Sequence, residues 1–229
     1  MLRLIEDFVQ LIYPKICLSC GVNLLRNETT ICTKCLYQIP RTNYHSDINN
    51  TVSQFFWGRV QVEIATSFYH FQKGSKFQKL IHQLKYSGHK EIGFEIGKHF
   101  GSELKNVDNF KNIDLIVPVP LHPKRKKKRG YNQSDWIAFG LSETMGIPVD
   151  TKNVYRNIET ETQTKKNRIE RWKNVDSIFK IKDFSAFENK HILLIDDVIT
   201  TGATIEACAT ALLTAENSKI SVATMAVVT

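Results

Sequence analysis

The stretch ILLIDDVITTGAT, residues 192–204, joins an apolar run to a polar loop. Its first four residues are all apolar, as expected of a strand that is buried on both faces of a sheet. Two adjacent aspartates follow, Asp196 and Asp197, and then a hydroxyl-rich loop, Thr200-Thr201-Gly202-Ala203-Thr204. Open α/β sheets bind ligands beyond the carboxyl ends of their strands. The stretch therefore predicts a ligand site at such an end.

This strand end would offer hydrogen-bond acceptors and donors side by side. The carboxylates of Asp196 and Asp197 can accept hydrogen bonds from sugar hydroxyls. The threonine hydroxyls and the free backbone N–H groups of a helix N-terminus favour an anion such as phosphate. A sugar phosphate needs both. The simpler alternative is an aspartate that caps the next helix. That role accounts for one of the two aspartates, but it does not account for the second aspartate or for the three threonines.

Strands and helices alternate through most of the chain, which predicts an α/β fold with a mostly parallel sheet flanked by helices. Apolar runs predict strands at residues 62–71, 113–120, 191–197 and 219–229. Helical periodicity and closing glycines predict helices at residues 76–88, 91–104, 132–146 and 202–217. Residues 36–60 have the character of a polar linker that becomes aromatic near its end.

Four of the five cysteines form two C-x-x-C pairs, which are Cys17 with Cys20 and Cys32 with Cys35. Two such knuckles bring four thiolates into a tetrahedral cage, the closed geometry of structural zinc. Gly21 follows the first pair, where the backbone of a knuckle often needs a positive φ. Disulfides are the alternative, and a cytosolic chain disfavours them. Cys208 stands apart in a helical run and is expected to be a small buried hydrophobe.

The chain is expected to have two parts. Residues 1–45 would hold an amphipathic helix and a small zinc ribbon, and residues 46–229 the α/β domain. Charged residues interrupt the apolar character of the first helix, so it does not read as a signal peptide. No run approaches the roughly 18 apolar residues of a membrane helix, so we expect no membrane insertion and a cytoplasmic location.

The net charge of +8 suggests an anionic partner, a phosphate ligand or a nucleic acid, as readily as a merely basic surface. The hydrophobic content of 42% excludes global disorder. Six consecutive cations occupy residues 124–129, just after the expected strand 113–120. They suggest that this segment attracts an anion electrostatically. A solvated basic turn or a nucleic-acid patch is the alternative.

The stretch 192–204 resembles the phosphoribosyl pyrophosphate (PRPP) motif of type I phosphoribosyltransferases. That resemblance implies that Asp196 and Asp197 hold the ribose hydroxyls with Mg²⁺ close by, and that the loop cradles the 5-phosphate. Two further stretches, IVPVPLHPKRKKKRGYNQS (116–134) and RNIETETQTKKNRIERWKNV (156–175), are similar to signatures of ComF-type competence proteins. The four-cysteine ribbon is also a feature of that family, so the resemblance covers nearly the whole chain.

The same resemblance assigns roles to other residues. The loop of Val119, Pro120 and Leu121 would bind the pyrophosphate group. Arg129, Arg156 and Arg171 would be catalytic, because cations and Mg²⁺ stabilise the charge that builds on the leaving pyrophosphate. Residues 156–174 resemble a mobile lid that excludes water from the reacting centre. An ordinary exposed helix is the alternative for that segment.

Two main hypotheses for function follow. The first is an enzyme that transfers a phosphoribosyl group from PRPP to an acceptor in a Mg²⁺-dependent reaction. The second is a non-catalytic protein of DNA uptake and recombination that handles single-stranded DNA beside competence and recombination proteins, or that senses PRPP. Basic residues favour the second hypothesis, and so do aromatic residues that could stack on bases. Those aromatics are Tyr37, Tyr44, Phe55, Phe56 and Trp57, and we expect them in the core instead.

Overall fold

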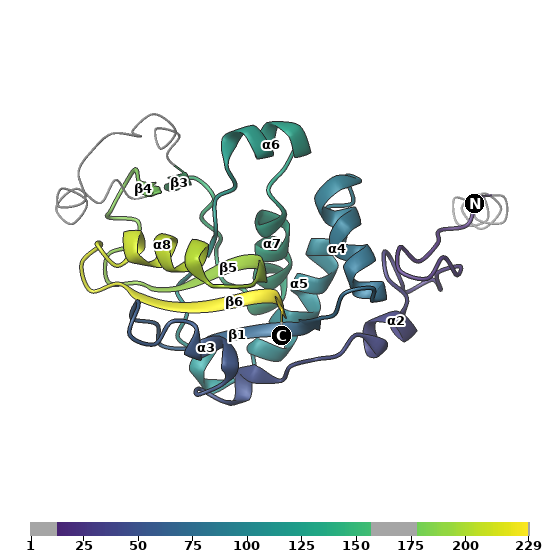
Figure 1. Ribbon diagram of the computed structural model, residues 1–229, viewed down its shortest axis with the longest axis horizontal. Helices are drawn as coiled ribbons and strands as arrows, with labels where there is room; N and C mark the ends of the chain where they lie inside the picture. The colour runs from purple at the N-terminus through teal and green to yellow at the C-terminus, as the bar shows by residue number, and fades with distance from the viewer. Residues whose placement is uncertain (1–12, 157–177, 229) are drawn as a thin grey trace.

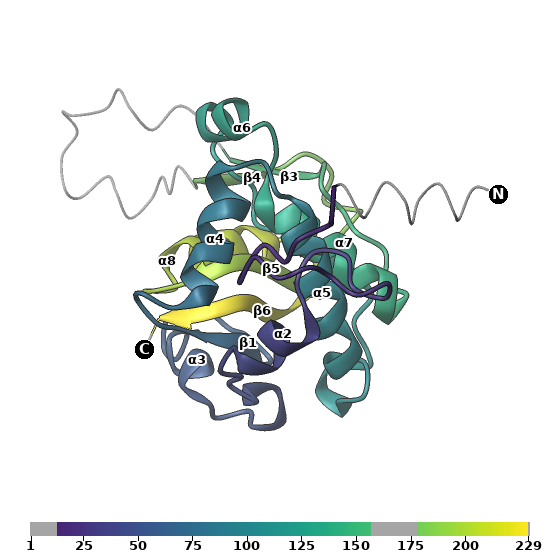
Figure 2. The same ribbon diagram turned by 90° about the vertical axis from the view of Figure 1, so that its right-hand side faces the viewer.

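A four-stranded parallel sheet forms the centre of the computed structural model, which describes residues 13–156 and 178–228. The strand order is β1-β6-β5-β2. Helix α8 covers one face of the sheet, and α5 and α7 cover the other (Figures 1 and 2). The strands are β1 (Ala65–Phe71), β2 (Leu115–Pro118), β5 (His191–Ile199) and β6 (Lys219–Val228). The predicted mostly parallel sheet flanked by helices is confirmed.

Strand β5 lies between β2 and β6 and is buried on both faces. Leu193 and Ile195 point into one hydrophobic core, together with side chains of α5 and α7. Ile192 and Leu194 point into a second core under α8. Alternate residues of a strand face opposite sides of the sheet. The continuous apolar run in the sequence is therefore the consequence of two cores that share one strand.

The helices behind the sheet follow the predicted periodicity closely. They are α4 (Lys76–Tyr86), α5 (Glu91–Leu104) and α7 (Gln133–Met145), and α8 (Ala203–Leu212) lies on the opposite face. Helices α5 and α7 approach each other through glycines. A Cβ atom at Gly97 would overlap the carbonyl oxygen of Ile137, and one at Gly140 would overlap that of Phe94. The missing side chains let the two helix backbones touch.

The basic run forms a helix, α6 (Pro123–Arg129), rather than a turn or loop. Pro123 occupies the first helical position, where its fixed φ favours the helix. His122 caps this end, because its Nδ1 accepts a 3.2 Å hydrogen bond from the backbone N–H of Lys124. Gly130 ends the helix with a φ of 87°. The favourable residues at both ends of the helix thus offset the repulsion between neighbouring cations.

Residues 36–60 pack against the sheet, so the expectation of a polar linker is wrong. The segment contains the end of α2 (Thr33–Gln38), a 3-10 turn at Tyr44–Ser46 and α3 (Thr51–Gln54). Asn50 is buried, caps α3 and donates a 2.8 Å hydrogen bond to the carbonyl of Ala65 in β1. This buried amide fixes a segment whose composition alone suggests exposure.

A second sheet is small and was not anticipated. Strands β3 (Val154–Arg156) and β4 (Phe179–Ile181) pair antiparallel, and Val154 and Phe179 join the core under α8. The lid predicted at residues 156–174 lies outside the described residues except for Arg156.

The N-terminal cysteine segment shares a hydrophobic core with the body of the protein. Cys17, Cys32 and Cys35 belong to the same buried cluster as Phe68 and Tyr69 of β1. The division at residue 45 stays a prediction. The amphipathic helix predicted at the start of the chain falls on residues 1–12, outside the described part. Among the described helices, none has the length and apolar character needed to cross a membrane.

Candidate functional site

The two adjacent aspartates lie near the carboxyl end of β5, where the sequence places them. Asp196 Oδ1 accepts a 3.1 Å hydrogen bond from Ser134 Oγ, at the start of α7, and a 2.8 Å bond from the backbone N–H of Asp197. Asp197 is only 5% exposed, and its Oδ2 lies 2.7 Å from Nζ of Lys85 on α4. Helices α4 and α7 therefore each contribute one polar partner to the acidic pair.

The two carboxyl groups have different electrostatic surroundings. Burial raises the pKa of Asp196 to about 7, and the neighbouring carboxylate of Asp197 contributes in the same direction. Hydrogen bonds from the Asp197 backbone and Ser134, and the charge of Lys85, oppose this increase in pKa. Like charges on adjacent residues cannot both be ionised without cost. Hydroxyl donors or a cation placed beside the pair would relieve this repulsion.

The loop after β5 forms the N-terminus of α8. Gly202 occupies the N-cap position with a φ of 75°, and a Cβ atom there would lie 3.3 Å from the ring of Phe56. Arg59 holds the loop from outside. Its guanidinium donates a 3.0 Å hydrogen bond to the carbonyl of Thr201 and pairs with Glu206 in the first turn of α8. A glycine with a left-handed backbone and a helix N-terminus together form a cradle suited to a phosphate group.

The predicted loop of Val119, Pro120 and Leu121 lies beside the acidic pair. The backbone N–H of Val119 donates a 2.8 Å hydrogen bond to the carbonyl of Ile195, the residue before Asp196. Nδ2 of the buried Asn132 donates a 3.1 Å hydrogen bond to the carbonyl of Val119. The β2 loop and the β5 strand end therefore form one continuous surface.

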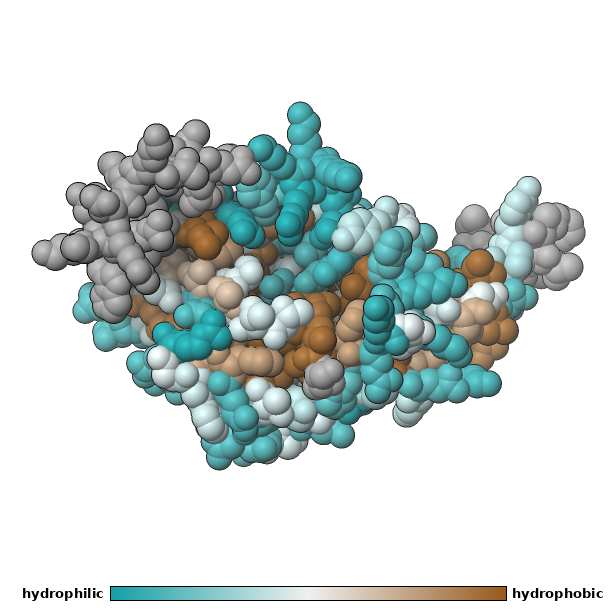
Figure 3. All heavy atoms as spheres, viewed as in Figure 1, coloured by the Kyte–Doolittle hydropathy of each residue, from teal (hydrophilic) through white to brown (hydrophobic). Residues whose placement is uncertain are grey.

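The predicted catalytic arginines do not converge on one point. Arg129 ends α6, with its guanidinium 5.5 Å from the ring centre of Tyr86, and lines a cavity of about 420 Å³. Arg156 lies at the end of β3, 5.6 Å from the ring centre of Phe179, and lines a different cavity of about 1020 Å³. Arg171 lies outside the described residues. Helix α6 contributes residues to both cavities, and Figure 3 shows the hydrophilic side chains gathered over it.

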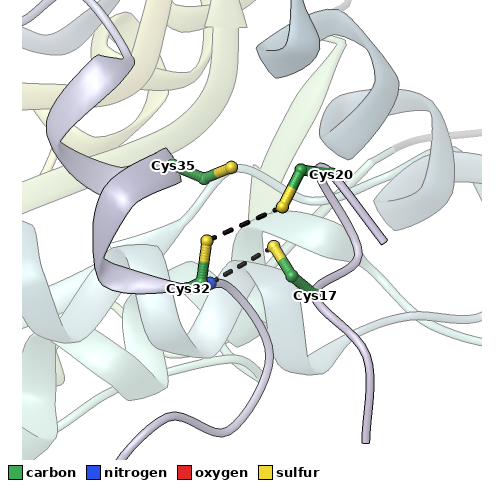
Figure 4. A group of neighbouring side chains, drawn as sticks. All are labelled: Cys17, Cys20, Cys32 and Cys35. Carbon is green, nitrogen blue, oxygen red and sulfur yellow. Dashed lines mark hydrogen bonds between the residues drawn. The ribbon is translucent and has the colours of Figure 1, made fainter. Parts of the chain in front are cut away.

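The four predicted metal-binding cysteines converge (Figure 4). Their sulfur atoms all lie within 4.8 Å of one another, and Sγ of Cys20 is 3.7 Å from Sγ of Cys32. A zinc–sulfur bond of about 2.3 Å gives a tetrahedral S–S edge of about 3.8 Å. None of these cysteines forms a disulfide. Gly21 has a φ of 78°, as predicted. The four-cysteine cluster thus fits a metal such as zinc.

Backbone hydrogen bonds prepare one of these thiols for a metal. Burial acts to raise the pKa of Cys17, but backbone N–H groups of Cys32, Cys20 and Ser19 together lower it to about 7. The bond from Cys32 to the Cys17 sulfur measures 3.2 Å. Such bonds favour the thiolate, the form of cysteine that binds metals.

Three contributors to the site were missed by the sequence reasoning. Lys85, Ser134 and Arg59 come from segments that lie far along the chain from their partners in the site. Ser134 is the last residue of the stretch 116–134, and its place in that stretch is the one sequence feature that could have indicated a role in the site. The other two lie in stretches with no recognisable site pattern, so only the fold reveals them.

Comparison with known proteins agrees with this geometry. The profile of the phosphoribosyl transferase domain matches residues 122–228. The DNA utilization protein YhgH of Escherichia coli (strain K12) is 29% identical over 202 residues, which cover 86% of this chain and 84% of YhgH. Competence protein ComFC of Bacillus subtilis (strain 168) is 34% identical over 136 residues, 59% of this chain and 53% of ComFC. Residues 122–228 thus match a phosphoribosyl transferase domain, and the chain is similar to the DNA utilization and competence proteins.

Solved structures are less similar to this chain in sequence. The glutamine PRPP amidotransferase of B. subtilis, solved with ADP and GMP, is 19% identical over 62% of this chain, at a TM-score of 0.45. The matched region is 30% of that larger chain. The match to the phosphoribosyl transferase domain begins at residue 122, so the cysteine cluster and Lys85 lie before it.

Proposed function

We propose that this protein binds PRPP together with Mg²⁺ and transfers the phosphoribosyl group to a nucleophilic acceptor, in a process linked to DNA uptake. The observation that carries the proposal is the acidic pair at the end of β5, placed directly before the loop in which Gly202 begins α8. Asp196 and Asp197 would accept hydrogen bonds from the ribose hydroxyls. Thr200, Thr201, Ala203 and Thr204 would surround the 5-phosphate.

The charge distribution supports PRPP as the ligand. Hydroxyl donors of a ribose would stabilise the ionised form of Asp196, whose pKa burial now raises to about 7. Mg²⁺ prefers oxygen ligands and suits a site that combines carboxylates with phosphates. When bound, it would supply positive charge that favours departure of the pyrophosphate. The carboxylates of the protein would orient the ribose through its hydroxyls.

The binding step can be tested with calorimetry. PRPP and ribose 5-phosphate are titrated into the protein in the presence of Mg²⁺. We expect micromolar affinity for PRPP and much weaker affinity for ribose 5-phosphate, because only PRPP carries the diphosphate. The double variant Asp196→Asn with Asp197→Asn should abolish PRPP binding while its circular dichroism spectrum stays unchanged. Normal PRPP binding by that variant would contradict the site assignment.

Zinc is the metal we propose for the cysteine cluster, where it would be structural. Four sulfur ligands close a tetrahedral site and leave no position for a substrate. Because the cysteines share the core that contains Phe68, the metal would stabilise both the ribbon and its contact with β1. This role predicts about one zinc per chain in the purified protein.

Binding of single-stranded DNA is a second candidate function, and the exposed basic helix α6 favours it. Five of its seven side chains are exposed cations, Lys124 to Lys128. The aromatic residues give a mixed picture. Phe56 is buried as expected, whereas Tyr37 and Trp57 are 81% and 58% exposed, so the expectation of a core position is wrong for these two. Neutralising Lys124–Arg129 should reduce the salt dependence of oligonucleotide binding if DNA lies along α6.

A further inference from the structure

The cavity of about 1020 Å³ near β3 is separate from the acidic pair. Its walls come from the loop after β2, from α6, from the start of α7 and from the β3–β4 pair. Helix α6 and the β3–β4 pair lie at the same end of the molecule in both ribbon views (Figures 1 and 2). Neither Asp196 nor Asp197 lines this cavity. Its volume is sufficient for a ligand as large as a mononucleotide.

The buried part of the cavity contains an unpaired hydrogen-bond acceptor. Nδ2 of Asn132 donates hydrogen bonds to the carbonyl of Val119 at 3.1 Å and to Oδ1 of Asp135 at 2.7 Å. Both amide hydrogens are therefore used. Oδ1 of Asn132 is buried and has no hydrogen-bond partner among the described residues. Because a buried acceptor without a donor is unfavourable, a ligand that brings a donor to this point would be stabilised.

Asp135 supplies a second acceptor beside Asn132. Its side chain is 15% exposed, and its Oδ2 lies 3.9 Å from Nζ of Lys126, which is beyond hydrogen-bond distance. Burial raises the pKa of this carboxyl group, whereas the charge of Lys126 and the hydrogen bond from Asn132 lower it. Two neighbouring N–H donors on one edge of a ligand would therefore find an acceptor each.

The walls of the cavity suit a planar ring. They include three proline rings, those of Pro118, Pro120 and Pro123, and the aromatic ring of Tyr155. Tyr155 is 37% exposed, although it is a large aromatic residue. Stacking of a nucleobase on such a side chain is favourable for every base, because each base has a π-face.

The exposed part of the cavity is basic. Five cations line it, which are Lys126, Lys127, Lys152, Arg156 and Lys182. The four lysines are exposed. Asp135 is the one acidic residue among the described residues that line the cavity. Lysine and arginine side chains in excess over carboxylates attract an anionic group such as a phosphate. The same excess disfavours a ligand that carries a positive charge.

We infer that this cavity binds a guanine mononucleotide, with the Watson–Crick edge of the base against Asn132 and Asp135 and the phosphate among the exposed lysines. Guanine carries two neighbouring donors on that edge, N1–H and the 2-amino group. Adenine and cytosine instead place an acceptor beside their amino group, which would face another acceptor here. The inference goes beyond the proposed function and does not depend on it, because the acidic pair does not line the cavity.

The test measures the affinity of the full-length protein for GMP, IMP, AMP and guanosine by calorimetry. IMP differs from GMP only by the missing 2-amino group, and guanosine differs only by the missing phosphate. The titrations are repeated in the double variant Asp196→Asn with Asp197→Asn, so that the ribose phosphate of a nucleotide has no acidic pair to occupy. Circular dichroism checks the folding of each variant.

Two single variants probe the base contacts. Asp135→Asn removes the charged acceptor at nearly constant size, and Glu143→Gln is the matched control because it is exposed on the same helix. Tyr155→Ala removes the stacking surface and gives an independent test if Asp135→Asn folds poorly. Lys182→Gln removes one cation near the expected phosphate.

We expect GMP to bind about tenfold more tightly than IMP or AMP, as is typical of one hydrogen bond to a charged group. Asp135→Asn should weaken GMP binding about tenfold and remove most of the preference over IMP. Glu143→Gln should change neither quantity. Tyr155→Ala should weaken GMP and AMP by similar factors, and Lys182→Gln should weaken GMP more than guanosine. The double variant should bind GMP as the wild-type protein does.

Four outcomes would overturn the inference. Loss of GMP binding in the double variant would place the nucleotide at the acidic pair. Equal affinities for GMP and AMP would refute the contacts of the base with Asn132 and Asp135. A guanine oligonucleotide that binds more tightly than GMP, and loses affinity in Asp135→Asn, would assign the cavity to a nucleic-acid strand. Absence of GMP binding in the wild-type protein would refute the site and leave the proposed function intact, because PRPP binding is measured separately.

Discussion

The hydroxyl of Ser134 donates a 3.1 Å hydrogen bond to Oδ1 of Asp196 and thereby joins the first turn of α7 to the end of β5. Ser134 is fully buried, so water cannot replace this donor. The bond lowers the pKa of Asp196 and opposes the effect of burial. One buried hydroxyl thus helps to set the charge of the acidic pair.

Replacing Ser134 with alanine should therefore raise the pKa of Asp196 above its present value of about 7. The free energy of unfolding should fall by about 1 kcal/mol at pH 8, because a partly buried ionised acceptor loses its donor. The loss should be smaller at pH 5, where the carboxyl group is neutral. Urea unfolding at both pH values checks this. Ser142→Ala on the same helix is the control, and an equal loss at both pH values in Ser134→Ala would refute the link.

The raised pKa of Asp196 also predicts how stability depends on pH. Its value in the unfolded chain is close to the ordinary 3.8, and in the folded protein it is about 7. Between these values the folded state binds more protons than the unfolded state, so the stability contribution of this group decreases as the pH rises from 4 to 7. Asp196→Asn removes the titration. We expect the variant to gain on the order of 2–4 kcal/mol over wild type between pH 4 and pH 8.

Thermal unfolding of both proteins across this pH range provides the measurement. The decisive quantity is the difference between variant and wild type, because other groups titrate in both. A difference that stays constant from pH 4 to pH 8 would show that Asp196 keeps an ordinary pKa in the folded state.

Removal of the metal should destabilise more than the cysteine ribbon. Three of the cluster cysteines share a core with Ile31, Leu36 and Phe68, so loss of the metal should loosen the contact with β1. We expect a chelator, or Cys32→Ser, to remove about one zinc per chain and to lower the melting temperature by several degrees. Zinc content is measured by elemental analysis.

Cys208 supplies the control for this prediction, because it lies on α8, buried in the second core and apart from the cluster. Cys208→Ala should keep the full zinc content even if it costs some stability through a small cavity. A zinc content near zero in the wild-type protein purified without chelators would count against a structural metal.

Substitution at Gly202 should affect the phosphate cradle directly. Its φ of 75° is unfavourable for alanine, and a Cβ atom there would lie 3.3 Å from the ring of Phe56. We expect Gly202→Ala to cost about 1 kcal/mol or more in unfolding free energy. It should also weaken binding of ribose 5-phosphate, because the helix N-terminus shifts away from its ligand.

Gly146 provides a matched control, since its φ is 73° but a Cβ atom there would have open space. Gly146→Ala should show the backbone cost without the loss of affinity. If both variants bind ribose 5-phosphate equally well, the cradle at Gly202 does not hold the 5-phosphate.

The sequence predicts most of the sheet because the sheet depends on local patterns. The continuous apolar run at Ile192–Ile195 indicates a strand that is buried on both faces. The helical periodicity of α4 and α5 indicates helices that are buried on one face. The cysteine cluster is predictable for a similar reason, since tetrahedral geometry restricts the spacing of its ligands. Side chains such as those of Asp196 and Gly202 are also found by pattern, because strand, acid pair and loop are contiguous.

Other features depend on contacts between distant segments and leave no local trace. The polar composition around Asn50 suggests a linker, yet one buried amide fixes that segment to β1. Six consecutive cations leave a solvated turn open as an alternative, yet with Pro123 at the start and Gly130 at the end they form a helix. Lys85 reaches Asp197 only because α4 packs beside the carboxyl end of the sheet. Such pairings arise from tertiary packing, which a single sequence does not encode in any short stretch.

The contact between Gly97 and Gly140 has a consequence for how this protein tolerates change. Helix α7 carries Ser134 at its first turn, and its distance from α5 is set by two residues without side chains. A larger residue at either glycine would force α7 away from α5. The first turn of α7, which carries Ser134, would move with the helix. Mutations at the rear of the molecule should then alter ligand affinity without touching the ligand. The position of Ser134 beside Asp196 therefore depends on how closely α5 and α7 pack against each other.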